Sequence, residues 1–212
     1  MTPVDFVSLA QQCAPNVHPT TLQAVVKTES GFNPFAIGVV GGHLARQPRS
    51  QAEAVATARA LEAAGWNYSM GLAQVNRINL RAYGLDVSSV FDPCSNLRAG
   101  ASILGDCYTR ALAGGRTPRQ ATSAAFSCYY SGNFRTGFRP DIRGTSYVQR
   151  VAANANVAAP ASETSVPAIA VIANGSAPAK PVSVDKPARD RHAPRGESDS
   201  STHPAWDVLG DF

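Results

Sequence analysis

Residues 19–31 read PTTLQAVVKTESG, and this stretch combines a helical pattern with one charged side chain on the apolar face. Four residues share that face by the spacing i, i+3, i+4 and i+7: Leu22, Val25, Val26 and Glu29. Pro19 suits a first helical position, and Gly31 suits the residue just past a helix end. We therefore predict a helix that begins near Pro19, ends before Gly31 and turns Glu29 toward the interior.

A carboxyl group at this place should be a weak acid. Apolar burial disfavours the charged form, and so does the partial negative charge at the C-terminal end of a helix. Both effects raise the pKa of Glu29 toward the range in which a general acid works near neutral pH. The alternative is that Glu29 lies at the edge of the stripe, facing solvent or pairing with an arginine. Residues 1–154 hold only two other glutamates, and both have structural explanations, Glu53 in a capping box and Glu62 on a solvent-facing helix surface.

Helical patterns continue on both sides of this stretch. The other predicted helices start at Thr2-Pro3, at the capping box Ser50-Gln51-Ala52-Glu53 (ending at Gly65), at Asn76 (ending at Tyr83), at Asp92-Pro93, at the capping box Thr117-Pro118-Arg119-Gln120, and at Ser146 (ending at Ala155). Alternating strand patterns are almost absent, and the segment 66–75 has room for a short hairpin. The long, Gly-rich loop 33–49 is of the kind that often carries function. The predicted fold is mainly α, with at most a small β-hairpin.

Charge and composition divide the chain into two parts. Residues 1–154 carry 14 Lys and Arg against 8 Asp and Glu, hence +6, whereas residues 155–212 carry 5 against 7, hence −2. The second part is rich in Pro, Ala and Ser and has two aromatic residues, so it cannot bury enough surface to offset chain entropy. We expect a folded domain over 1–157 and a disordered tail over 158–212. The apolar end of that tail, 203–212, is either a docking segment for a partner or a free terminus.

Composition also limits the partners. The net charge of +4 favours anionic partners but is too small to imply nucleic acid. No apolar run approaches the ~18–20 residues needed to cross a bilayer, so we expect no membrane span. We expect a monomer with no metal and no cofactor.

Four cysteines lie in the folded part: Cys13, Cys94, Cys107 and Cys128. None forms a CxxC pair, which argues against zinc and against a redox motif. Two disulfides in an exported protein is one interpretation, and buried free thiols in a cytosolic protein is the other. Three pairings are possible, and a bond between Cys94 and Cys107 is disfavoured if both lie on one helix. Residues 1–5 show no export signal. Either the signal is absent from this sequence or export uses another route.

Three further segments combine chain-turning residues with polar or aromatic groups. Gly71-Leu72-Ala73-Gln74 joins a flexible glycine to an amide that both donates and accepts, although an ordinary turn explains it equally well. The segment 128–133 offers Tyr129 and Tyr130 for stacking on sugars, with core packing as the alternative. The last predicted helix places Tyr147 and Val151 on one face, where core contacts are again the simpler explanation.

Taken in order, these segments resemble the lysozyme-like domain of the soluble lytic transglycosylase family, and in particular its members that serve type IV secretion systems. The matching residues are Glu29-Ser30 with Gly31-Phe32-Asn33-Pro34, then Gly71-Leu72-Ala73-Gln74, Asp92-Pro93, Asn96-Leu97, Gly100-Ala101, Tyr129 through Gly132, and Tyr147-Val148. Two positions depart from the family pattern: Tyr130 stands where an Asn is frequent, and Ala73 where a Met is common.

The resemblance implies cleavage of the β-1,4 bond between N-acetylmuramic acid and N-acetylglucosamine in peptidoglycan, without water, to a 1,6-anhydro product. It implies that Glu29 is the catalytic residue and that the chain acts in the periplasm, opening the wall for secretion system assembly. Other secretion components are possible partners of the tail. The implied substrate-binding residues are Ser30, Gly71, Leu72, Gln74, Tyr129 and Tyr147. A hydrolytic lysozyme-like glycosidase and a non-catalytic wall-binding scaffold stay open as alternatives.

Overall fold

The computed structural model describes residues 3–142 and 144–155, which form helices packed around a small sheet. The elements in chain order are α1 (Pro3–Cys13), α2 (Pro19–Ser30), β1 (Ile37–Val39), α3 (Gln51–Ala63), β2 (Tyr68–Met70), β3 (Val75–Asn76), η1 (Arg77–Tyr83), η2 (Ser89–Phe91), α4 (Pro93–Ala113), α5 (Pro118–Ser131), η3 (Thr136–Phe138) and α6 (Tyr147–Ala155). The predicted mainly α fold is confirmed. The predicted tail, 158–212, and the domain boundary at 157 lie outside the described residues.

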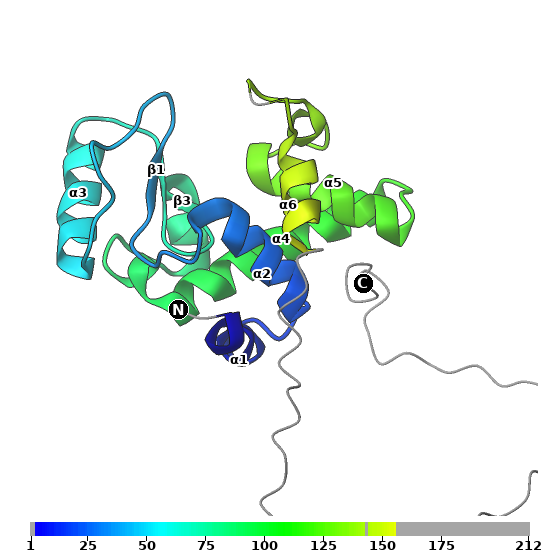
Figure 1. The fold of residues 1–212 in the computed structure, drawn as a ribbon, viewed down its shortest axis with the longest axis horizontal. Helices are drawn as coiled ribbons and strands as arrows, with labels where there is room; N and C mark the ends of the chain where they lie inside the picture. Colours follow the sequence, from blue (N-terminus) through cyan, green and yellow to red (C-terminus); the bar gives the residue numbers. More distant parts are fainter. Residues whose placement is uncertain (1–2, 143, 156–212) are drawn as a thin grey trace, which may run out of the picture. The chain divides into compact units, whose positions relative to one another are not determined.

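Two pairs of neighbouring helices organise the domain. The long helix α4 packs along α5, and α2 packs along α6, while α1 contacts both α2 and α4. In Figure 1, α3 and the strands stand on one side, α5 and α6 on the other, and α2 and α4 run between them. The apolar stripe of α2 lies in the core, where Leu22, Val25 and Val26 are at most 1% exposed. This burial fixes the orientation of the last turn of α2, which carries Glu29.

The sheet is larger than the hairpin that the sequence predicts. Strands β2 and β3 form an antiparallel hairpin, and β1 pairs with the other edge of β2 to give the order β1-β2-β3. The third strand comes from the Gly-rich loop 33–49, whose sequence lacks an alternating pattern. A side chain explains its placement: Gln47 accepts from the Ile37 amide (2.8 Å) and donates to the Ile37 carbonyl (3.0 Å), covering the outer edge of β1.

The predicted helix ends are mostly confirmed. Asp92 caps α4 by accepting from the Ser95 amide, and Thr117 and Gln120 form the full capping box of α5. The box predicted for α3 is only half formed: Ser50 accepts from the Glu53 amide, but the Glu53 carboxylate binds the Arg49 amide and the Arg46 guanidinium instead. The charged Arg46 outcompetes the backbone amide of Ser50 as a partner. The segment predicted as a helix from Asn76 is the 3₁₀ helix η1, capped by Asn76.

All four cysteines are bonded. Cys13 pairs with Cys94 and so joins α1 to α4, while Cys107 pairs with Cys128 and joins α4 to α5. The expectation of two disulfides is therefore confirmed, and the structure selects one of the three pairings. No helix in the part of the chain that the structure describes has the length and apolar character needed to span a membrane.

Candidate active site

A cleft of about 960 Å³ runs between the sheet and the helices α4 and α5, and Glu29 lies among its lining residues. Gly31 ends α2 with a left-handed φ of 59°, so Glu29 belongs to the last helical turn as predicted. Its side chain is half-buried. Burial raises the pKa of Glu29 from its ordinary 4.5 to about 7, against the opposing influences of a hydrogen bond from Tyr147 and the positive charge of Arg150. A carboxyl with this pKa is in part protonated at neutral pH and can donate a proton.

Tyr147 holds the Glu29 carboxyl from α6. Its hydroxyl donates to Glu29 Oε1 at 2.6 Å, a contact between residues 118 positions apart. The Tyr147 ring is buried and stacks on Tyr130, with ring centroids 4.6 Å apart and planes 16° from parallel. Burial and the nearby Glu29 raise the pKa of Tyr147 well above 10, so the hydroxyl keeps its proton and stays a donor. The position of the carboxyl is thus set by a packed aromatic pair.

Gln74 reaches the cleft from the turn between β2 and β3. Its backbone has a φ of 49°, which is uncommon for a residue other than glycine, and its Nε2 donates to the carbonyls of Ala36 (3.0 Å) and Gly71 (2.9 Å). Both amide protons are used in this way. Within the described residues the Oε1 atom accepts no hydrogen bond, and a Cβ at Gly38 would lie only 2.7 Å from it. Because Gly38 has no side chain, it leaves room for Gln74 Oε1.

Asn96 of α4 is completely buried, and its side chain forms hydrogen bonds with that turn. It donates to the carbonyls of Met70 (3.0 Å) and Val90 (2.8 Å) and accepts from the Ala73 amide (2.7 Å). A Cβ at Gly71, whose φ is 79°, would overlap the Asn96 amide. Sequence reasoning included Asn96 only as part of the family pattern. An asparagine in the first turn of a helix gives no local signal of a contact 23 residues earlier in the chain.

Tyr129 forms part of the helical wall of the cleft. Its hydroxyl donates to the Ala73 carbonyl at 2.5 Å, so the turn and α5 are joined beside Glu29. Burial and the neighbouring Glu29 raise the pKa of Tyr129 well above 10. A Cβ at Gly100 would lie 2.5 Å from Ala73 Cβ and 3.1 Å from the Tyr129 hydroxyl, which explains the glycine at this position of α4.

Four of the predicted substrate-binding residues do not line the cleft: Ser30, Gly71, Leu72 and Tyr147, the last of which contacts Glu29 from α6. The Ser30 hydroxyl donates to the Val26 carbonyl within α2, at 3.2 Å. Leu72 has no exposed surface and belongs to the core, and Gly71 lies against Asn96. In this structure the first three support the turn and the helix end, whereas Glu29, Gln74 and Tyr129 face the cleft.

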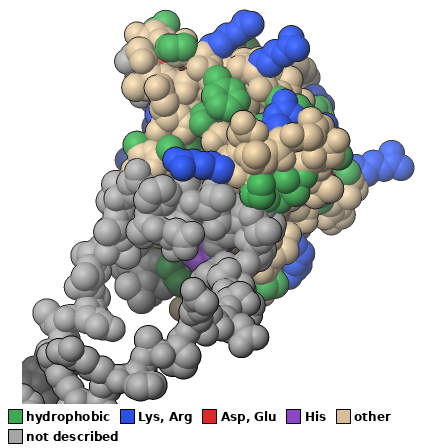
Figure 2. All heavy atoms as spheres, turned by 90° about the vertical axis from the view of Figure 1, so that its right-hand side faces the viewer, with side chains coloured by type: hydrophobic (Ala, Val, Ile, Leu, Met, Phe, Trp, Pro, Cys, Tyr) green, Lys and Arg blue, Asp and Glu red, His purple; other side chains and the backbone are tan. Residues whose placement is uncertain are grey.

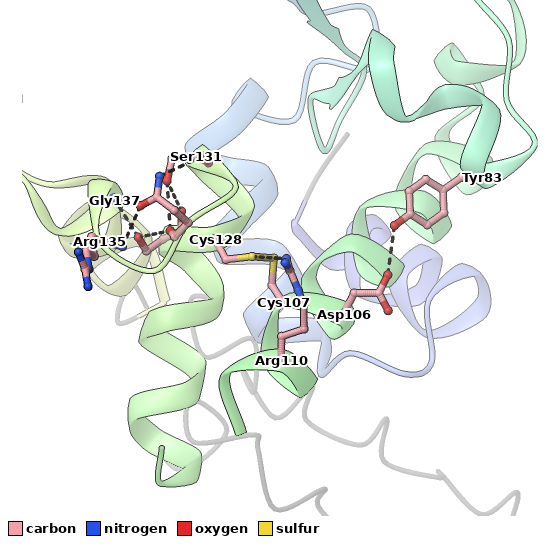
Figure 3. The surroundings of a disulfide bond; sticks show 10 residues. Tyr83, Asp106, Cys107, Arg110, Cys128, Ser131, Arg135 and Gly137 are labelled. Carbon is pink, nitrogen blue, oxygen red and sulfur yellow. Dashed lines mark hydrogen bonds between the residues drawn. A yellow bond between two sulfur atoms is a disulfide. The ribbon is translucent and has the colours of Figure 1, made fainter. Parts of the chain in front are cut away.

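The cleft also has features that the sequence did not indicate. Asp106 and Tyr83 line it, with the Tyr83 hydroxyl donating to Asp106 Oδ2 at 3.2 Å. The disulfide Cys107–Cys128 forms part of the same wall, with the Arg110 guanidinium against it, 2.8 Å from Cys128 Sγ (Figure 3). Asp106 is not among the charged neighbours that set the pKa of Glu29. The cleft thus contains a second, exposed carboxylate.

Metal ions have no evident site here. Over residues 3–142 and 144–155, no three His, Cys, Asp or Glu side chains come close enough together to hold one. The chemistry available to the described residues is proton transfer by Glu29, next to hydrogen-bonding groups of the turn and of α5.

A mainly helical domain with a small antiparallel sheet across a cleft, and one half-buried acid at that cleft, defines a lysozyme-like protein. The family model of the transglycosylase SLT domain matches residues 6–145, and the chain belongs to this family. No solved structure gives a significant match to the chain.

The similar proteins carry a common name. The chain is 57% identical over 157 residues to the "Type IV secretion system protein virB1" of Brucella abortus, a match that covers 73% of this chain and 65% of that protein. It is 35% identical over 152 residues to "Protein virB1" of Agrobacterium fabrum, covering 69% and 58%, respectively. "Protein virB1" of Rhizobium radiobacter is 30% identical over 217 residues, covering all of this chain and 75% of the relative. The match with the Brucella protein thus spans just under two thirds of that protein's length.

Proposed function

We propose that this protein is a peptidoglycan lytic transglycosylase and that Glu29 is its catalytic acid and base. One observation carries the proposal: the Glu29 carboxyl, with a pKa raised to about 7, lies in a cleft of about 960 Å³ and is held by Tyr147. A general acid for glycoside cleavage needs a pKa near the working pH and a fixed orientation. Membership of the SLT transglycosylase family supports the same assignment.

The proposed reaction uses one carboxyl group twice. Glu29 first donates its proton to the glycosidic oxygen between N-acetylmuramic acid and N-acetylglucosamine, and the bond from C1 to that oxygen breaks. The Glu29 carboxylate then removes the proton from the C6 hydroxyl of the same muramyl residue, whose oxygen bonds to C1. Glu29 regains its proton, a 1,6-anhydro ring forms and no water is consumed. The buried hydroxyl of Tyr147 keeps the carboxyl oriented in both steps.

The substrate contacts divide into direct and indirect ones. We assign direct contact with the saccharide to Gln74 and Tyr129, because both border the cleft beside Glu29. Gln74 Oε1 is the available acceptor for a substrate hydroxyl or amide, since its NH₂ group is bound to the backbone. Tyr147 acts through Glu29. Ser30, Gly71 and Leu72 act by fixing the helix end and the turn.

The biological setting follows from the relatives. The name of the Brucella abortus relative places that protein in a type IV secretion system, and we propose that this chain cleaves the wall locally for such a system in the periplasm. The charge of residues 1–154, +6, suits an anionic wall polymer. In this proposal residues 1–157 form the catalytic domain, and residues 203–212 are the candidate segment for docking on another secretion component.

The decisive measurement is mass spectrometry of muropeptides released from purified sacculi. Anhydro products are lighter than hydrolysed products by one water, so their appearance supports the proposal. Glu29→Gln should abolish release while leaving sacculus binding intact. Glu62→Gln is the matched control because Glu62 is exposed, does not line the cleft and lies in a long ion pair with Arg77, at 4.0 Å. Release by Glu29→Gln at the wild-type rate would refute the assignment, and no release by either protein would favour a wall-binding scaffold.

Asp106 gives a specific reason to test a second candidate, a hydrolytic glycosidase. Two-carboxylate glycosidases lose activity when either acid is removed. Under the transglycosylase proposal, Asp106→Asn keeps the anhydro products and most of the rate, because Glu29 alone serves as acid and as base in that reaction. A loss as large as that of Glu29→Gln, together with products that contain the added water, would establish hydrolysis instead.

A further inference from the structure

A cluster of arginines surrounds Phe134 next to the cleft. Two depressions, of about 530 Å³ and 570 Å³, adjoin this ring. Four arginines line them, and we call these residues the arginine patch: Arg116, Arg119, Arg135 and Arg139. Figure 2 views the molecule from the side on which α5 lies in Figure 1 and shows Lys and Arg side chains among apolar ones, with almost no acidic side chain in view.

Several of these groups have a defined position. The Arg116 guanidinium lies over the Phe134 ring at 4.6 Å, and Arg110 approaches the same ring at 5.8 Å. Asn133 Oδ1 accepts from the backbone amides of Arg135 (3.0 Å) and Thr136 (2.9 Å), so the segment that carries Arg135 is held in a tight turn. The patch is therefore built on an ordered part of the fold.

The same turn is anchored to α5. The Ser127 hydroxyl donates to the Asn133 carbonyl at 2.8 Å and accepts from the Gly137 amide at 3.0 Å. A Cβ at Gly137 would lie 2.5 Å from Ser127 Cα, so only glycine permits η3 to pack this closely against the helix. Ordering the turn in advance lowers the entropic cost of binding a ligand.

The patch lacks counter-charges. Neither depression has an Asp or Glu in its lining. Within residues 3–142 and 144–155, the ion pairs of arginines are Arg46 with Glu53, Arg77 with Glu62 and Arg150 with Asp141. None of them involves a patch residue. Four guanidinium groups without ion-pair partners in the described part of the chain form a site that complements carboxylates, which arginine binds in bidentate geometry.

The patch continues from the catalytic cleft. Gly132 lines both the cleft and the second depression, and the cleft wall at this end includes Cys128 and Arg110. Figure 3 shows the disulfide in the middle of this region, with Arg135 on one side of it and the pair of Tyr83 and Asp106 on the other. A ligand that fills the cleft can therefore extend past Gly132 onto the arginines.

We propose that the arginine patch binds the carboxylates of the stem peptides that branch from the glycan strand held in the cleft. The inference rests on the proposed function and adds to it a preference for strands that still carry their peptides. Stem peptides bear several carboxylates close to the muramyl residue. In a peptide-substituted strand the lactyl carboxyl of that residue is bound as an amide, so the sugars themselves carry no charge. The preference would direct cleavage to peptide-substituted regions of the wall.

The test compares binding to two forms of the wall. The full chain carrying Glu29→Gln, which leaves the substrate intact, is titrated against sacculi and against glycan strands from which an amidase has removed the peptides. The amidase leaves one lactyl carboxylate on each muramyl residue, in place of the several carboxylates of a stem peptide. The triple substitution Arg119→Gln, Arg135→Gln and Arg139→Gln removes three exposed patch charges. The control triple Arg59→Gln, Arg81→Gln and Arg98→Gln removes the same charge from residues that line neither the cleft nor the depressions.

We expect the patch triple to weaken binding to sacculi about tenfold and to leave binding to stripped strands within about twofold. The control triple should stay within about twofold on both. Equal losses on both substrates, or an equal loss in the control, would overturn the proposal. Tighter binding of the patch triple to both substrates would also overturn the proposal. It would indicate instead that the acidic segment 155–212 competes with the wall for the patch. If the parent protein binds neither form, the proposed function itself fails.

Discussion

Opposing influences act on the Glu29 carboxyl. Burial disfavours its charge, while the Tyr147 hydroxyl and the positive charge of Arg150 favour it. Burial is the largest of these influences, and the pKa of Glu29 is about 7. An ordinary glutamate is almost fully ionised at neutral pH and is a poor proton donor, whereas Glu29 is divided between its two forms. That balance suits a group which must first give up a proton and then take one back.

Tyr147→Phe should move the pH profile of the reaction. The hydroxyl lowers the pKa of Glu29, so its removal raises this pKa further above the ordinary value. Because the reaction starts from protonated Glu29, the alkaline limb of kcat/KM shifts to higher pH. The maximal rate falls about tenfold as the carboxyl loses its orientation. The profile is measured from pH 5 to 9. Tyr130→Phe is the control, since it keeps the ring stacked on Tyr147, and its limb should stay in place.

Glu29→Gln should stabilise the fold at high pH. The folded-state pKa of Glu29 is raised to about 7 from 4.5, so above pH 4.5 the unfolded state gives up this proton more readily than the folded state, and the carboxyl destabilises the fold. Wild type and variant should be equally stable below pH 4.5. The stability difference between them grows as pH rises from 4.5 to about 7 and levels off above 7, at about 3 kcal/mol or less in favour of the variant. Urea unfolding at pH 4, 6 and 8 tests this, and a difference independent of pH would contradict the burial of the carboxyl.

Among the elements, the turn between β2 and β3 has the largest influence on the cleft. It carries Gln74 in a left-handed conformation, receives the Tyr129 hydroxyl at the Ala73 carbonyl and rests on Asn96. Backbone strain at a candidate site persists only where surrounding contacts enforce it. Here the two hydrogen bonds of the Gln74 side chain and the three of Asn96 enforce it. The turn therefore presents Gln74 to the cleft in one fixed conformation.

Gly71→Ala should disrupt this turn and the activity together. The substitution combines an unfavourable φ of 79° with overlap on the Asn96 amide, and we expect a loss of about 3 kcal/mol or more in the free energy of unfolding. Gly65→Ala is the matched control because Gly65 has a φ of 74° but open space around it. We expect it to cost about 1 kcal/mol. Denaturant unfolding measures both losses. Equal losses would contradict the expectation that overlap with Asn96 adds to the cost of the Gly71 substitution.

At the scale of the whole molecule, the cleft depends on how its two sides are held together. The sheet and η1 form one side, and α4 and α5 the other. The disulfide Cys107–Cys128 joins α4 to α5 within the cleft wall, whereas Cys13–Cys94 joins α1 to α4 and does not line the cleft. The two bonds should therefore contribute differently to stability and to activity.

Removing each disulfide by paired Cys→Ala substitution should separate these contributions. Cys13–Cys94 spans 81 residues and Cys107–Cys128 spans 21, so loss of the first should cost about 1 kcal/mol more in unfolding free energy. Loss of Cys107–Cys128 should reduce activity more, because Arg110 rests on its sulfurs and Tyr129 follows Cys128 directly. Thermal unfolding and muropeptide release measure the two effects. Parallel losses in both measurements would argue against a particular role of this bond in the cleft.

The sequence by itself determined the local features. Helical spacing and capping depend on neighbouring residues alone, so four features were predictable. They are the bounds of α2, the glycine that ends it, the caps of α4 and α5, and the position of Glu29 on the inward face of its helix. The family, too, was recognisable from short segments in a fixed order, and the match over residues 6–145 confirms it.

Only the tertiary structure decided which distant groups meet. Four features join segments far apart in the chain. They are the hydrogen bond from Tyr147 to Glu29, the hydrogen bonds of Asn96 to the turn, the third strand and the pairing of the cysteines. It also showed that Leu72 supports the cleft from within the core and that Asp106 and the arginine patch border it. Such contacts arise from how whole helices pack, and no local pattern records the packing partner.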